Sequence, residues 1–146
     1  MTLFDHEKLD VYQLELAFIG WVTSLFENLK DQGAVRIAEV CDHLDRASLS
    51  SLFNTAEGNG KRQRATRAKF FDDARGSATE CAGCLDALVA KRVCGPERVV
   101  EGKQMLARIV AMLTKLVQRY SDDARLKEDE VEYKTDIHTD EPNGID

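Results

Sequence analysis

Proline is almost absent from this chain, and its placement constrains the fold more than any other feature. The two prolines are Pro96 and Pro142, so residues 1–95 contain none. Proline removes a backbone donor and interrupts helices, and loop-rich β folds use it at their turns. A proline-free stretch of this length favours long helices, and we find no convincing strand pattern beside it.

Apolar residues recur at spacings of three and four in four segments, which glycine or Gly-Pro separates. The predicted helices cover residues 5–29, 34–57, 65–93 and 96–120. At the Gly95–Pro96 boundary we expect a left-handed glycine to end the third helix and proline to begin the fourth. The buried stripe expected for the first helix is Leu9, Tyr12, Leu16, Ile19, Val22, Phe26 and Leu29, and Leu14, Phe18 and Leu25 widen it.

Length and charge divide the chain into a body and a tail. Its 146 residues suffice for one domain with a core of its own. Residues 1–121 carry seventeen basic and sixteen acidic residues, whereas residues 122–146 carry ten acidic and three basic ones. Short connections imply antiparallel neighbours. The sequence thus predicts an all-α, up-and-down antiparallel four-helix bundle over 1–121 and a flexible acidic C-terminal tail over 122–146.

Several classes of function find no support in the sequence. The chain has no apolar run of about 20 residues and no secretory start, so we expect a cytoplasmic protein with no membrane partner. Cys81 and Cys84 form a CxxC in mid-helix, and we interpret them as core residues because a zinc site would need a second pair or nearby histidines. No nucleophile–base pair can be assembled. We therefore expect no enzyme, no metal and no cofactor.

One cluster of cations stands out in the body of the chain. Five basic residues fall within nine positions, with no acid between them: Lys61, Arg62, Arg64, Arg67 and Lys69. Such a cluster can contact phosphates of a nucleic acid. The alternative is a set of solvated side chains that pair with Glu57, Asp72 or Asp73. The sequence leaves both open.

Just before these cations lies a motif, Leu44-x-Arg46-Ala47-x-x-Ser50-x-x-x-Asn54-x-Ala56-Glu57-Gly58-x-Gly60-Lys61. With Leu9-x-Val11-Tyr12-Gln13, Arg75-Gly76-Ser77 and Met112-Leu113-x-x-Leu116, it resembles the bacterial four-helix-bundle family first described from intervening sequences in large-subunit ribosomal RNA genes. Three positions depart from the family pattern. Leu52 stands where proline is frequent, Asp45 where a second arginine is common, and Asn59 where an aromatic residue often lies.

The resemblance carries expectations about assembly and structure. It implies a ring-shaped homo-oligomer, commonly a pentamer, without established catalytic activity. A related branch, the accessory protein of diversity-generating retroelements, is strongly basic and binds nucleic acid, and this acidic chain looks less like it. Matching motif positions are expected to be structural: Arg46, Ser50, Asn54, Glu57, Gly58, Gly60 and Gly76.

Two of these motif residues invite specific interpretations. Asn54 is expected to bridge to a neighbouring helix, where a buried polar pair can fix register. Glu57 lies at the unfavourable end of the helix dipole and needs a donor, for which Arg46, Arg75 and an amide near Gly60 are candidates.

Together these features predict a non-enzymatic, oligomeric binding or scaffolding module. The cations from Lys61 to Lys69 would form a basic rim that associates with RNA or another nucleic acid. The alternative is a structural or protein-partner adaptor without a nucleic-acid role.

Overall fold

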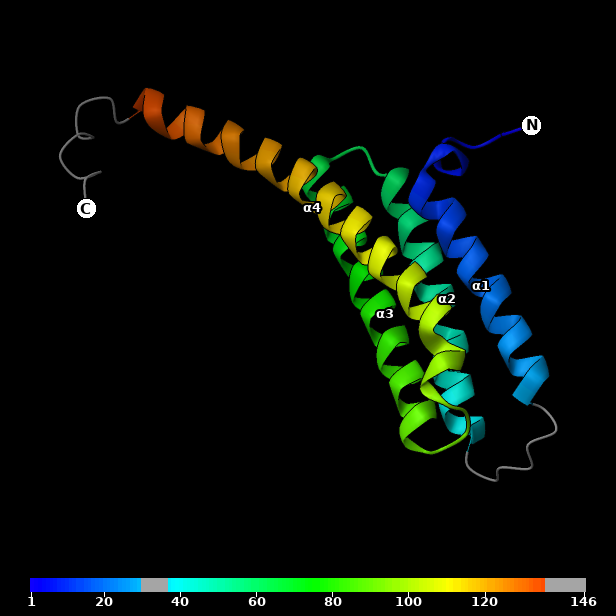
Figure 1. Ribbon diagram of the computed structural model, residues 1–146. Helices are drawn as coiled ribbons and strands as arrows, with labels where there is room; N and C mark the ends of the chain where they lie inside the picture. The colour runs from blue at the N-terminus through cyan, green and yellow to red at the C-terminus, as the bar shows by residue number, and fades with distance from the viewer. Residues whose placement is uncertain (30–36, 136–146) are drawn as a thin grey trace, which may run out of the picture.

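Helices make up the architecture of the part of the chain that the structure describes. The computed structural model describes the backbone of residues 1–29 and 37–135, and the side chains of these residues as far as Ser121. In these ranges there are no strands, and the predicted all-α bundle is confirmed (Figure 1). The elements are η1 (Asp5–Lys8), α1 (Asp10–Leu29), α2 (Ile37–Asn59), α3 (Arg64–Ala90), η2 (Pro96–Val99) and α4 (Val100–Thr135).

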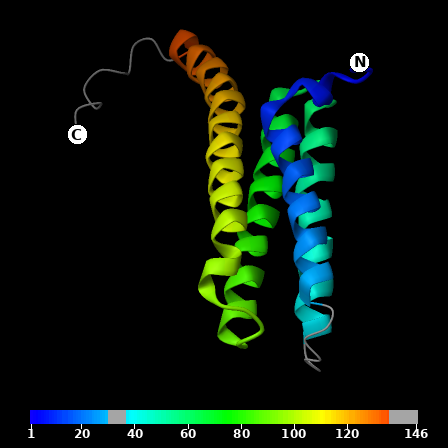
Figure 2. The ribbon, with the colours of Figure 1, turned by 45° about the vertical axis from the view of Figure 1, so that its right-hand side comes forward.

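The four long helices run alternately up and down. Helix α2 packs on α3 and α3 packs on α4, while α1 contacts both α2 and α4. Helix α4 does not end near Tyr120 but continues to Thr135, and its last part runs on past the end of the bundle (Figures 1 and 2). The predicted boundary at residue 121 therefore falls inside a helix. Residues 136–146 of the predicted tail lie outside the described part of the chain.

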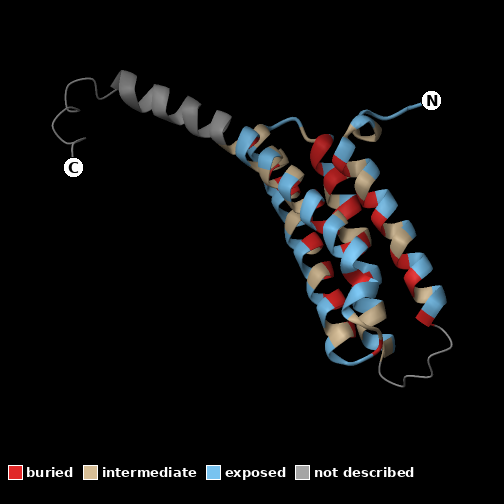
Figure 3. Cartoon of the chain, in the orientation of Figure 1, coloured by how far each residue is buried: buried red, intermediate tan, exposed pale blue. Residues whose placement is uncertain are grey.

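The hydrophobic core runs along the inward faces of all four helices (Figure 3). Burying a large apolar side chain contributes about 1.5–3 kcal/mol, so this layer is the main source of stability. Its largest fully buried apolar side chains are Phe71, Leu44, Leu85, Leu88, Ile109 and Leu113.

Helix α1 buries part of the expected stripe and its widened side, together with Val11 and Glu15, which were not expected in the core. Its buried residues are Val11, Glu15, Phe18, Val22, Leu25 and Leu29. Leu16, assigned to the buried stripe, is 41% exposed. Apolar residues surround most of this helix, so periodicity alone permits more than one register. Packing against α2 and α4 selects the register that buries Glu15.

The end of α3 also differs from the expectation. The helix stops at Ala90, and Arg92 takes the left-handed position with φ of 61°. The Val93 amide donates to the Leu88 carbonyl at 3.0 Å and the Arg92 amide to the Val89 carbonyl at 2.9 Å, which caps the last turn. Gly95 has φ of −79°, so it is not the left-handed residue, while Pro96 does begin η2 as predicted.

Candidate functional site

The predicted basic cluster lies at one end of the bundle, where α2 passes into α3. Tight backbone bonds make this turn: the Gly60 amide donates to the Glu57 carbonyl at 3.0 Å, and the Lys61 amide donates to the Gly58 carbonyl at 3.1 Å. Gly58 is needed for packing, because a Cβ there would lie 2.8 Å from Cβ of Phe70. Helix α3 then begins at Arg64, so the cations occupy the turn and the first turns of α3.

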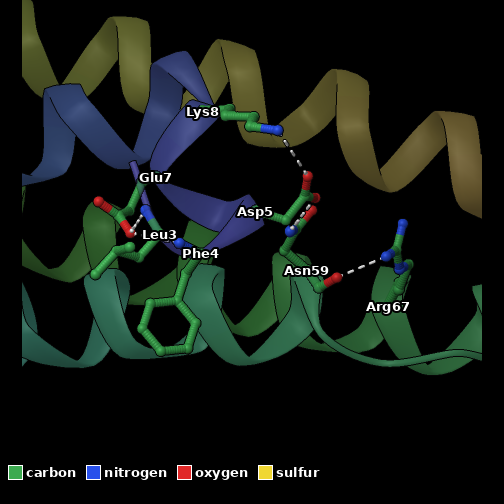
Figure 4. Close-up of polar contacts among 7 residues, drawn as sticks. All are labelled: Leu3, Phe4, Asp5, Glu7, Lys8, Asn59 and Arg67. Atoms are coloured by element: carbon green, nitrogen blue, oxygen red, sulfur yellow. Dashed lines mark hydrogen bonds and ion pairs between the residues drawn. The ribbon is translucent and has the colours of Figure 1, made fainter. Parts of the chain in front are cut away.

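Arg67 fastens this turn to the rest of the bundle. Its Nε donates to the Lys61 carbonyl at 2.8 Å, its Nη2 to the Asn59 carbonyl at 2.6 Å and its Nη1 to the Tyr120 hydroxyl at 3.0 Å. The Asn59 side chain in turn donates to Asp5 at 2.9 Å (Figure 4). A single guanidinium thus ties the end of α2 to α4, and Asn59 extends the connection to η1.

Tyr120 is the centre of an arginine cluster. The guanidinium carbons of Arg64, Arg67 and Arg119 lie 4.6, 5.2 and 5.7 Å from the centre of its ring. The ring itself is 8% exposed and packs against Phe71. Cation–π attraction to a fixed ring restrains these long side chains. We call the five predicted cations together with Arg119 the basic end.

The sequence analysis did not include Arg119 in the cluster, because it lies 52 positions after Arg67. In the sequence, the only indication of this role was that Arg119 stands next to Tyr120 near the expected end of the fourth helix. Antiparallel packing of α3 and α4 brings it to the first turns of α3.

The two lysines of the cluster have acidic partners. Lys61 Nζ lies 3.4 Å from Glu57 and Lys69 Nζ lies 3.9 Å from Asp73, and both ammonium groups also lie over the Phe70 ring. This is the pairing that the alternative interpretation anticipated. Arg62 is exposed. Among the predicted anion contacts, Arg67 is therefore a structural clamp, whereas Arg62 and Lys69 are exposed.

The motif residues have mixed roles. The Asn54 amide donates to the carbonyl and hydroxyl of Ser50 in its own helix at 2.9 and 3.2 Å, and the contact between helices comes from the Ser50 and Ser77 hydroxyls, 2.9 Å apart. Lys61 supplies the donor to Glu57 that was expected from Arg46, Arg75 or an amide. Arg46 is exposed, and a Cβ at Gly76 would meet nothing within 4 Å.

The sequence matches the model of one protein family, described as 23S rRNA-intervening sequence protein, over residues 7–115. The chain belongs to this family. The match covers α1, α2, α3 and the first part of α4, and with them the whole α2–α3 turn. A search of the curated proteins found no match. None of the described helices is both long and apolar enough to cross a membrane.

A shallow groove in this family member lies beside Arg119, between the start of α1 and α4. Its volume is about 280 Å³. Apolar side chains alternate in it with charged ones, so it joins a hydrophobic surface to the basic end. The residues that line it are Leu9, Asp10, Val11, Met112, Lys115, Leu116 and Arg119.

A second groove, of about 540 Å³, lies between α2 and α3. His43 Nε2 contacts Glu80 across it, and Cys84 lies in its wall. Burial raises the pKa of Cys81 to about 12 and also raises that of Cys84, so both thiols stay protonated at neutral pH. The described side chains bring no three metal-ligating groups together here or elsewhere.

The structure also shows a polar contact that the sequence analysis missed. Glu15 of α1 is 2% exposed, and its Oε2 accepts hydrogen bonds from Ser51 at 2.7 Å and Thr55 at 2.8 Å. Burial raises its pKa to about 7, although both hydroxyls act in the opposite direction. In the sequence, the only indication that Glu15 is buried was its spacing, four residues after Val11 and three before Phe18.

Proposed function

We propose that this member of the 23S rRNA-intervening sequence family is a non-enzymatic, homo-oligomeric binding module that contacts RNA through its basic end. The observation that carries the proposal is the cluster of arginines around Tyr120, with Arg62 exposed on the adjoining turn. The family's name associates it with 23S rRNA, which makes RNA the first ligand to test.

The geometry of the arginines supports phosphate binding. A guanidinium presents several donors in one plane and matches a phosphate better than an ammonium does. Arg64 and Arg119 are held by the Tyr120 ring, so fewer side-chain rotamers are lost when a phosphate binds. The same ring is locked by Phe71 and by the Arg67 hydrogen bond, so the cluster is built on a rigid support.

The groove beside Arg119 supports a single-stranded RNA over a duplex. Single strands are recognised through unstacked bases that rest on apolar or aromatic surfaces, while cations contact the backbone. Met112 and Leu116 supply apolar surface in the groove, and Lys115 and Arg119 supply charge along its side. A duplex would offer phosphates but no accessible base face.

Assembly would multiply this weak site. A body with a charge near +1 attracts one RNA poorly, whereas several copies of the basic end on one face of a ring would sum their potentials. Large apolar side chains at the surface, Leu16 at 41% and Phe53 at 59% exposure, support self-association. We propose the pentamer as the assembly, following the family resemblance.

The test combines mass and binding on the full chain. Light scattering should give several protomers per particle. Fluorescence anisotropy with a labelled single-stranded RNA should show binding that weakens steeply as salt increases. The double variant R62A/R119A should bind about tenfold more weakly at low salt and show a shallower salt dependence, because each lost phosphate contact reduces the slope by about 1.

The matched control removes the same charge from the opposite end of the bundle. K91A/R98A deletes two exposed cations near the α3–α4 connection and should bind RNA like the wild type. Equal losses in both double variants would show a nonspecific charge effect and contradict the proposed site. A monomer that binds no RNA at low salt would favour the alternative, an adaptor for a protein partner.

A further inference from the structure

Glu15 occupies an unusual place for a carboxyl group, the interface between α1 and α2. Both hydroxyl donors reach the same oxygen, Oε2, from one face of α2. The other oxygen, Oε1, is also buried and has no hydrogen-bond partner among the described residues. The carboxyl is therefore only half satisfied, between Val11 and Phe18 of the apolar core.

The surroundings of Glu15 determine whether its protonated or its ionised carboxyl is the more stable form. The buried polar residues on the adjoining face of α2 are Ser48, Ser51, Thr55 and Asn59, all uncharged. On α4, Lys115 and Arg119 line the groove beside Val11, one turn before Glu15, and no charged group in the described part of the chain contributes to the pKa of Glu15. Burial dominates the pKa of Glu15, and only the two hydroxyls act against it. The ionised form is thus buried without a charged partner in the described structure, which is costly.

Helix α1 is the element whose attachment to the bundle should depend on the ionisation of Glu15. Helix α3 packs against α2 on one side and α4 on the other through much of its length, whereas α1 makes less extensive contacts with α2 and α4 (Figures 1 and 2). Its contact with α2 has polar residues at its centre, and at the end of the molecule Asp5 of η1 holds Asn59. Apolar residues of α1 remain buried on either side of this polar centre, so an unpaired charge at Glu15 would shift the equilibrium toward detachment without removing the rest of the packing.

We propose that Glu15, Ser51 and Thr55 form a proton-operated latch, which holds α1 on α2 while Glu15 is protonated and lets α1 detach when Glu15 ionises. This inference is independent of RNA binding and goes beyond it. It also has a consequence for the basic end. Detachment of η1 and α1 removes Asp5 from Asn59, whose carbonyl anchors Arg67 (Figure 4).

The direction and size of the effect follow from linkage. With α1 detached, Glu15 is solvated and should titrate near its ordinary value of 4.5, compared with about 7 in the closed bundle. The closed form therefore holds the proton more tightly, and its advantage is lost as pH rises from about 4.5 through about 7. Between pH 6 and pH 8 the opening equilibrium of α1 should increase about tenfold.

Hydrogen exchange on the full chain tests the latch. Protection factors of α1 amides, corrected for the intrinsic pH dependence of exchange, should fall about tenfold from pH 6 to pH 8. They should also be lower than those of α3 amides at each pH. The variant E15Q cannot ionise and should keep α1 protection constant over this range. E27Q changes an exposed glutamate of the same helix and should behave like the wild type.

A second measurement keeps the test independent of how well E15Q folds. The carbon chemical shift of the Glu15 carboxyl should titrate with a midpoint near 7, and S51A/T55V should move this midpoint upward, because both hydroxyls stabilise the ionised form. A midpoint in the ordinary range of glutamate would overturn the latch. Equal protection of α1 and α3 at every pH would also overturn it, since the bundle would then open only as a whole.

Discussion

At the scale of single residues, Arg67 shows how a cation in a basic run can be a structural clamp. Its three hydrogen bonds satisfy two backbone carbonyls at the α2–α3 turn and the Tyr120 hydroxyl. We expect R67A to lower the free energy of unfolding by about 2–3 kcal/mol, because bonds to a charged donor are strong and the freed carbonyls are partly shielded from water. Urea unfolding followed by circular dichroism measures this change.

Two variants separate geometry from charge at this position. R67K keeps the charge but cannot reach three diverging acceptors, so it should lose about half as much stability as R67A. R62A removes an exposed cation from the same run and should change the stability by no more than about 0.5 kcal/mol. If R67A and R62A were equally mild, the clamp would contribute nothing to stability.

At the scale of helices, the sequence predicted the elements well and their facing surfaces less well. Regular spacing and Gly–Pro punctuation place four helices, because these signals are local. The register of α1 is set by contacts with α2 and α4, so Leu16 could not be recognised as exposed or Glu15 as buried. The arginines around Tyr120 were missed in part for the same reason, since Arg119 joins them only through the packing of α3 on α4.

Two glycines also show that contacts between helices cannot be inferred from local sequence, and alanine substitutions at these glycines should have opposite effects on stability. A Cβ at Gly102 of α4 would lie 2.4 Å from Cζ3 of Trp21 in α1, whereas one at Gly76 of α3 would meet nothing within 4 Å. Alanine raises helix propensity at both sites by up to about 1 kcal/mol. G102A should nevertheless lower stability by about 1–2 kcal/mol, because overpacking displaces Trp21. G76A should raise stability by up to about 1 kcal/mol.

Thermal unfolding of the two alanine variants, together with tryptophan fluorescence, provides the check. A shifted emission spectrum in G102A alone would locate its effect at Trp21. Stabilisation by both substitutions would show that α1 and α4 can move apart at no cost. Destabilisation by G76A would restore the structural role that the family motif suggested for Gly76.

At the scale of the whole molecule, charge and burial act on different parts of the protein. The tail residues 122–146 carry all of the net negative charge, while the basic end is at the α2–α3 turn and Glu15 is inside the bundle. The acidic tail could be recognised directly from the charges in the sequence. The other two depend on tertiary packing, which decides whether a charged side chain is solvated, paired or buried.

The stability of the whole bundle should therefore fall as pH rises through neutrality, whether or not α1 opens separately. Glu15 titrates near 4.5 in the unfolded chain and near 7 in the folded one, so its contribution is complete below pH 4.5 and lost by the time pH exceeds 7. A shift of this size corresponds to about 3 kcal/mol. Between pH 5 and pH 8, urea unfolding should show a loss of about 2.5 kcal/mol in the wild type, relative to the change in E15Q measured in parallel, because part of the contribution is already lost at pH 5. The subtraction matters because other groups titrate in both proteins, and identical pH profiles for the two would mean that Glu15 is already solvated in the native state.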